Sequence, residues 1–119
     1  MVKIIEVRTK SELKAFVNFQ FTLYKRNPFW VPPIKKEELY FLDKDCNPAF
    51  KTSDVSLFLA YNEKKIVGRI AAIVNWVEVR RLKKNKVRFG WFDVVDDFEV
   101  TRLLIEKVKE FGKSRKMDF

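Results

Sequence analysis

Four stretches of the chain carry the apolar patterns of β-strands. In residues 55–61, Val55, Leu57, Leu59 and Tyr61 alternate with the residues between them and give one strongly apolar face. The middle of 66–75 is apolar on both faces, which indicates a central strand, and the turn at 62–65 joins the two stretches as a hairpin. Strands are predicted at 3–7, 55–61, 66–75 and 87–95.

Helical spacing of apolar residues appears in the intervening segments. Thr9 and Glu12 have the spacing of a capping box and precede apolar residues that recur every three or four positions, so a helix is predicted at 11–24. A short helix is expected from about Pro33 to Leu42, followed by a loop at 43–51, and residues 76–86 allow another short, basic helix. A last helix is expected to begin at Asp96 or Asp97 and to stop near Gly112. Its buried face would hold Val100, Leu103, Leu104, Val108 and Phe111.

The predicted order of elements is β-α-α-β-β-β-α. Strands joined by hairpins favour a mainly antiparallel sheet with helices packed on it, so the fold class is α+β. The chain has 119 residues, of which 47% are hydrophobic and 15% aromatic. This length and composition suit one domain, residues 1–119, with a real core.

Composition also bounds the cellular setting. No apolar run approaches the length of a membrane span, the first residues lack a signal peptide, and Cys46 has no second cysteine to pair with. We therefore expect a cytoplasmic protein without a membrane partner. Abundant Lys, Arg and Glu beside a single Gln are typical of a thermophilic source.

The absence of histidine limits the chemistry. Ser-His-Asp and Cys-His catalysis are excluded, and too few soft ligands remain for zinc. A general base would be a carboxylate, a lysine, a tyrosine or a held water molecule. Residues 43–47 resemble the first half of a calcium loop, but Pro48 stands where the loop needs glycine and Asp54 where it needs a bidentate glutamate. No metal is expected, and Cys46 beside two aspartates is not set up as a reactive thiolate.

The net charge of +9 attracts anions: nucleic acid, anionic lipid or a phosphorylated cofactor such as coenzyme A. Residues 80–88 hold six cations, which are typical either of a solvated basic face or of a contact with nucleic acid or a coenzyme phosphate. Arg69 interrupts an apolar strand. It would point to solvent, pair with a carboxylate such as Asp93, or reach a ligand.

Several segments, in this order, resemble GNAT-type N-acetyltransferases. They are 27–33 (NPFWVPP), 47–50 (NPAF), 58–61 (FLAY), 67–75 (VGRIAAIVN) and 88–93 (RFGWFD). The resemblance covers nearly the whole chain and implies the N-terminal half of the GNAT fold. It also implies acyl transfer from acetyl-coenzyme A, or another acyl-coenzyme A, to an amine.

The resemblance suggests where ligands would lie. Strand-four backbone donors near Phe92, Asp93 and Val94, with Arg69, would face the cofactor, while Phe29, Trp30, Tyr40 and Phe41 would shape the acceptor side or else pack the proline-rich connector on the core. No residue is assigned as the catalytic base.

The chain departs from the GNAT pattern before its last helix. GNAT enzymes place a glycine-rich loop there, whose backbone N–H groups hold the pyrophosphate. Residues 95–100 (VDDFEV) have no glycine and three carboxylates, Asp96, Asp97 and Glu99, which suit helix capping and repel a pyrophosphate. A carboxylate site at these residues is the alternative interpretation.

The resemblance also implies that the remaining GNAT strands lie outside this chain, so we expect a fragment that is not catalytic alone. Its open fourth strand predicts a homodimer or pairing with a missing C-terminal half. The rival expectations are a basic module that binds nucleic acid and a structural dimerisation module.

Overall fold

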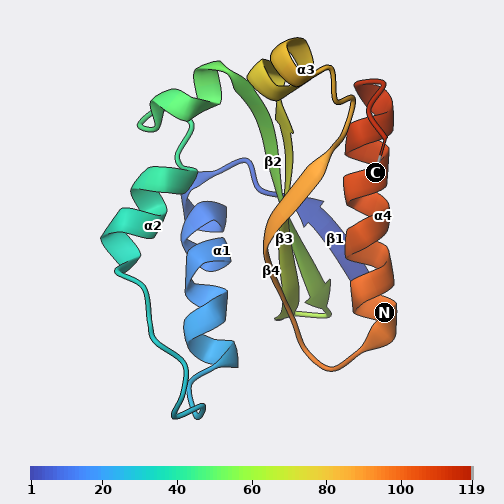
Figure 1. The fold of residues 1–119 in the computed structure, drawn as a ribbon. Coiled ribbons are helices and arrows are strands. Elements are labelled where there is room, and N and C mark those ends of the chain that lie inside the picture. Colours follow the sequence, from blue (N-terminus) through green and yellow to red (C-terminus); the bar gives the residue numbers. More distant parts are fainter. Residues whose placement is uncertain (119) are drawn as a thin grey trace.

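The computed structural model describes residues 1–118, which form a four-stranded sheet covered on both faces by helices (Figure 1). The strands are β1 (Val2–Glu6), β2 (Ser53–Asn62), β3 (Lys65–Asn75) and β4 (Arg88–Val94). The helices are α1 (Lys10–Leu23), α2 (Lys35–Leu42), α3 (Trp76–Leu82) and α4 (Phe98–Ser114), with a short 3₁₀ helix, η1 (Pro48–Lys51). The predicted α+β class and the order of strands are confirmed, and the element order β-α-α-β-β-β-α gains the helix α3, which lies in the segment 76–86 where a short basic helix was allowed.

Every neighbouring pair of strands in the sheet is antiparallel, in the order β1-β2-β3-β4. Ile4 lies opposite Ala60, Phe58 opposite Ile70, and Arg69 opposite Asp93. The central position of β3 agrees with its apolar residues on both faces, because each face of a central strand meets a covering layer.

Two apolar cores fill the space between the sheet and its helices. Figure 1 shows α1 and α2 on one side of the sheet and α4 on the other. Phe16 and Val17 of α1 pack with Leu59 on the first side, whereas Leu104 and Val108 of α4 pack on the second. Among residues 1–118, no helix is long and apolar enough to cross a membrane.

The first helix begins as its sequence predicts. The Thr9 side chain accepts a hydrogen bond from the Glu12 N–H, and the Glu12 carboxylate accepts one from the Thr9 N–H. The Glu12 carboxylate also accepts a hydrogen bond from the Arg8 N–H at 2.8 Å, and these bonds from the backbone N–H groups of Arg8 and Thr9 lower the pKa of Glu12. The capping box is therefore confirmed, and it fixes the start of α1 beside the end of β1.

Some helix boundaries differ from the prediction by two residues. Helix α2 begins at Lys35 rather than at Pro33, and the expected loop contains the 3₁₀ turn η1. Helix α4 continues past Gly112 to Ser114. Gly112 lies in a tight contact instead, since a Cβ on it would stand 2.7 Å from Val87 Cγ1.

The described chain ends beside the beginning of β4. The Asp118 N–H donates to the Asn85 carbonyl at 2.7 Å, and the Val87 N–H donates to the Asp118 carbonyl at 2.8 Å. These two bonds make a parallel bridge between Lys86 and Asp118. The backbone thus turns, after α4, toward the edge of the sheet that β4 forms.

Candidate functional site

The outermost strand β4 contains a β-bulge. Arg69 pairs with Asp93 and Ala71 pairs with Gly90, so Trp91 and Phe92 together face the single residue Ile70. Trp91 has a φ of 46°, in the left-handed region that a bulky residue rarely occupies. A bulge of this kind interrupts the regular pairing and redirects the side chains and backbone groups around it.

The bulged strand also presents backbone groups at an open edge. The Val95 N–H donates to the Val67 carbonyl on the β3 side. Because N–H directions alternate along an antiparallel strand, the Val94 N–H points away from β3. Among residues 1–118, no strand pairs with this outer edge of β4 apart from the bridge at Lys86.

A buried polar network supports the bulged strand from the α1 side. The Arg69 side chain is 3% exposed and donates from Nη2 and Nε to Asp93 Oδ2 at 2.7 and 2.9 Å. Its Nη1 donates to the Phe16 carbonyl at 2.9 Å, and the guanidinium lies over the Phe16 ring. Of the alternatives predicted for Arg69, the structure shows the pair with Asp93, and the side chain does not face solvent.

Tyr24, at the end of α1, completes this network. Its hydroxyl donates to Asp93 Oδ1 at 2.5 Å. This bond to the carboxylate, with burial and the Asp93 charge, raises the pKa of Tyr24 to about 12. The carboxylate of Asp93 thus accepts bonds from β3 and α1 together and fixes where α1 sits on the sheet.

A mostly apolar hollow of about 400 Å³ lies between α2 and the bulge. Trp91 lines one side of it, and its indole Nε1 donates to Glu38 Oε2 at 3.1 Å. Its lining is Pro33, Ile34, Glu37, Glu38, Phe41 and Trp91. The hollow combines an apolar surface with two carboxylates, which is a suitable environment for a cationic group attached to an apolar body.

The expected acceptor-side residues are only partly brought to this place. Trp30 packs on the rings of Phe21 and Tyr24, at 5.3 and 5.7 Å between centroids. Phe29 is 91% exposed and Tyr40 is half exposed, and neither lines the hollow, whereas Phe41 does. The expectation that the proline-rich segment 27–33 packs on the core is thus correct for Trp30 and wrong for Phe29.

Sequence reasoning missed Glu38 and Trp91. The two glutamates of α2 have the usual spacing of acids in the first turn of a helix, so they carry no distinct signal. The left-handed backbone at Trp91 has no signature either, since glycine is the residue that normally marks it.

The carboxylates before α4 have structural partners. The Asp97 side chain accepts from the Glu99 N–H at 2.9 Å and caps the helix. Glu99 accepts two bonds from the Arg102 guanidinium, which lower the pKa of Glu99. The capping interpretation is confirmed for Asp97, and the surface at this helix start is acidic.

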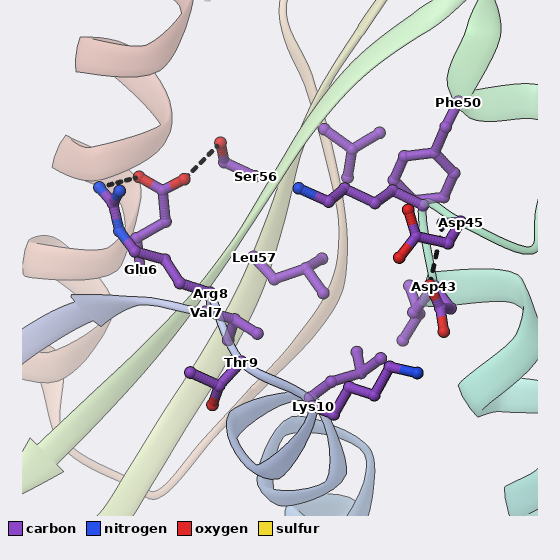
Figure 2. A pocket seen from close by; sticks show the side chains of 14 residues that line it. Glu6, Val7, Arg8, Thr9, Lys10, Asp43, Asp45, Phe50, Ser56 and Leu57 are labelled. Carbon is purple, nitrogen blue, oxygen red and sulfur yellow. Dashed lines mark hydrogen bonds and ion pairs between the residues drawn. The ribbon is translucent and has the colours of Figure 1, made fainter.

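A second cavity, of about 360 Å³, lies far from β4 in the sheet. Figure 2 shows it between the end of β1, the start of α1 and the loop after α2. Glu6 accepts from Ser56 Oγ at 3.2 Å and pairs with Arg8 at 3.4 Å, while Asp43 accepts from the Asp45 N–H. Glu6 is thus engaged by two neighbours, and β3 lies between the cavity, which β2 lines, and the bulge in β4.

The remaining sequence features lie elsewhere on the surface. Arg88 makes a 2.7 Å ion pair with Glu78 of α3, and its bond lowers the pKa of Glu78, while the other cations of 80–88 are exposed. Loss of solvation and the nearby Asp43 carboxylate raise the pKa of Cys46, as expected for an unreactive thiol. Among residues 1–118, no group of His, Cys, Asp or Glu is arranged to hold a metal.

Solved structures with this arrangement are GNAT acetyltransferases. A tandem GNAT protein from the clavulanic acid biosynthesis pathway has a TM-score of 0.72 at 12% identity, over 97% of this chain and 34% of its own. An acetyltransferase of the GNAT family from Staphylococcus aureus has a TM-score of 0.63 at 22% identity, over 99% of this chain and 69% of its own. A predicted acetyltransferase from Clostridium acetobutylicum, solved with acetyl-CoA, has a TM-score of 0.64 at 12% identity, over 99% of this chain and 77% of its own. The chain has a GNAT-like fold.

Two curated proteins are similar in sequence. Protein YghO of Escherichia coli K12 is 32% identical over 106 residues, which are 89% of this chain and 27% of that protein. The bacterial ceramide synthase of Caulobacter vibrioides is 29% identical over 115 residues, 96% of this chain and 30% of that protein. The chain thus spans under a third of each curated relative. No protein-family model matches it.

Proposed function

We propose that this chain supplies the acyl-thioester side of an acyl-CoA-dependent N-acyltransferase. The observation that carries the proposal is the bulged, open-edged strand β4, set in a GNAT-like fold. The substrates would be an acyl-coenzyme A and an amine, and the products an amide and free coenzyme A. Because the chain spans only part of its relatives, this activity belongs to the whole protein in which the fold is used.

The backbone at the edge of β4 would hold the thioester. A fixed N–H donor, such as that of Val94, stabilises the negative charge that develops on the carbonyl oxygen during attack by the amine. A C–N bond forms, the C–S bond breaks, and the amine proton passes to a base. In this proposal Phe92 and Val94 contribute backbone groups, whereas Arg69 and Asp93 act as positioning residues that hold β4 on α1.

The start of α4 does not fit the usual pyrophosphate site. The segment 95–100 contains no glycine, and the carboxylates of Asp97 and Glu99 are exposed there. A pyrophosphate would meet repulsion at this helix start instead of free N–H donors. We therefore infer that the acyl thioester at the strand edge contributes more to binding than the diphosphate of coenzyme A does.

The hollow beside Trp91 would receive the amine. Glu38 lies where it could meet an ammonium group and take its proton, while Ile34 and Phe41 would contact the apolar part of the acceptor. The Caulobacter relative is a bacterial ceramide synthase. Ceramide is an amide of a long-chain amino alcohol. The acceptor class we propose is accordingly an amine that carries an apolar chain.

Amide hydrogen exchange, with titration calorimetry on the same sample, tests the thioester site. Acetyl-coenzyme A should slow exchange in residues 90–94 and leave β1, at the opposite edge of the sheet, unchanged. Coenzyme A without an acyl group should bind more weakly. If neither ligand produces heat or protection in a folded sample, the thioester site is not in this chain.

The acceptor proposal has its own test. Dodecylamine should quench or shift the tryptophan fluorescence, and Trp91→Phe should remove this change because Trp30 and Trp76 do not line the hollow. Dodecanol, with the same chain and no charge, should bind more weakly. Glu38→Gln should remove this preference, and Glu63→Gln, in the β2–β3 turn, is the matched control. Equal binding of the amine and the alcohol by the unmodified chain would reject Glu38 as the amine contact.

A further inference from the structure

The segment between α1 and α2 is a turn with a defined structure. We call residues 25–36, which include the first two residues of α2, the connector; Figure 1 shows the chain extending beyond the end of α1 before it returns to α2. The Asn27 N–H donates to the Tyr24 carbonyl at 3.0 Å, and the Asn27 side chain accepts from the Phe29 N–H at 2.9 Å. Prolines at positions 28, 32 and 33 restrict the backbone further.

Within this turn, one aromatic residue is anchored and its neighbours are displayed. Trp30 packs on the rings of Phe21 and Tyr24. Phe29 and Val31, on either side of it, are 91% and 84% exposed, and Ile34 is 62% exposed. The connector therefore holds a rigid base on α1 while it presents apolar side chains to the surroundings, an arrangement that folding of residues 1–118 does not use.

Within residues 13–36 the charge has one sign, and the acidic residues that follow, Glu37 and Glu38, line the hollow beside Trp91. From residue 13 to residue 36 the chain has five cations and no acidic residue. Four of the cations, Lys25, Arg26, Lys35 and Lys36, lie at the two ends of the connector and are exposed. Lys35 also stands 4.5 Å over the ring of Phe21, which keeps its ammonium group close to the base of the turn.

We propose that the connector docks on the surface of an anionic lipid bilayer. Phe29 and Val31 would enter the headgroup region, and the four cations would lie among the lipid phosphates. Apolar side chains combined with cations are the features that hold peripheral proteins at such a surface. This binding needs no membrane-spanning helix, so the sequence expectation of no membrane partner, which rested on the lack of a span, does not argue against it.

The charge pattern favours lipid over a protein partner as the occupant. A protein that covered the connector would need acidic groups arranged opposite each of the four cations, whereas an anionic bilayer offers negative charge at every position around the inserted side chains. The proposal is independent of acyl transfer. The lipid-docking surface and the proposed amine site share Ile34, which belongs to the connector and also lines the hollow beside Trp91.

Vesicle co-sedimentation of the full chain tests the proposal. Vesicles of phosphatidylcholine mixed with phosphatidylglycerol should bind the protein, phosphatidylcholine alone should bind it far less, and high salt should weaken the binding. A Phe29→Ser/Val31→Ser variant should lose about tenfold or more in affinity, given the apolar area removed. Lys25→Gln/Arg26→Gln should also lose about tenfold, from two surface cations.

Two control variants distinguish binding through the connector from non-specific binding to vesicles. Phe98→Ser removes an apolar side chain that is 82% exposed at the start of α4, and it should bind vesicles as the unmodified chain does. Lys83→Gln/Lys84→Gln removes two exposed cations outside the connector and should have a smaller effect than Lys25→Gln/Arg26→Gln. Circular dichroism verifies that each variant is folded.

Three results would overturn the proposal. The first is no binding to the anionic vesicles, or equal binding to neutral ones. The second is loss of binding in the two control variants to the same extent as in the connector variants. The third is a change in self-association by light scattering in Phe29→Ser/Val31→Ser with vesicle binding intact, which would assign the connector to a contact between copies.

Discussion

Arg69 in β3 and Asp93 in β4 form a buried ion pair whose closest atoms, Nη2 and Oδ2, are 2.7 Å apart. The pair lies where the regular pairing of β3 with β4 meets the bulge, and α1 covers it through Tyr24 and Phe16. One carboxylate thereby joins two strands and a helix, so several consequences of changing it can be measured.

Asp93→Asn should destabilise the fold strongly. It leaves the Arg69 charge buried without a counter-charge, and breaking a buried pair typically costs about 3–5 kcal/mol in free energy of unfolding. Urea denaturation measures the change. Arg102→Ala, in the exposed pair with Glu99, should cost less than about 1 kcal/mol.

A double variant distinguishes charge burial from simple loss of contacts. Arg69→Met/Asp93→Leu removes both charges and should be closer in stability to the unmodified chain than Asp93→Asn is, because no unpaired charge remains. A double variant less stable than Asp93→Asn would mean that shape at this position matters more than charge.

Tyr24 should be recognisable in an alkaline titration. The folded-state pKa of Tyr24 is raised to about 12 from its ordinary value of 10.0, so the hydroxyl–carboxylate contact stabilises the fold below pH 10. This contribution should be lost as the pH rises through about 12. Absorbance of tyrosinate should show one late step, which Tyr24→Phe abolishes and Tyr40→Phe keeps. A late step that survives Tyr24→Phe contradicts the assignment.

Gly68→Ala should destabilise the core between β3 and α4. A Cβ at this position would stand 2.8 Å from Leu104 Cδ1 and 3.0 Å from Val100 Cγ1, and such overpacking costs about 1–3 kcal/mol. Gly90→Ala is the matched control, since a Cβ there meets nothing within 4 Å. Thermal unfolding of both variants measures the difference, and equal stability would show that α4 shifts without cost.

The open edge of β4 should promote association. Unpaired backbone groups at a sheet edge favour pairing with another chain, and a second copy is the partner available in a purified sample. Light scattering across a concentration series should therefore show a dimer at tens of micromolar. A monomer throughout that range would contradict this prediction and would indicate that the edge is left solvated.

Local signals in the sequence were sufficient for most secondary structure. Thr9 and Glu12 are three residues apart, so their mutual capping depends on the helix alone. Asp97 caps α4 for the same reason. The boundaries at Lys35 and Ser114 were less predictable, because a proline permits a helix start without requiring it and tertiary packing extends a helix past a glycine.

The candidate site depended on relationships that no local pattern holds. Tyr24 and Asp93 are 69 residues apart, and Glu38 and Trp91 are 53 apart. Arg69 illustrates the same limit: the strand pattern allowed it to pair with a carboxylate such as Asp93, to face solvent or to reach a ligand. Only the placement of α1 on the sheet determines that the pair is buried.

The sequence by itself thus determined the class of fold, the order of its elements, the caps of α1 and α4, and the chemistry that a chain without histidine cannot perform. Tertiary structure alone decided which carboxylates meet which donors, where the bulge in β4 falls, and that Phe29 is displayed while Trp30 is packed. The physical reason is the distance along the sequence over which each interaction acts. Periodicity and capping act over a few residues, whereas burial and ion pairing depend on surfaces that meet only when distant segments pack together.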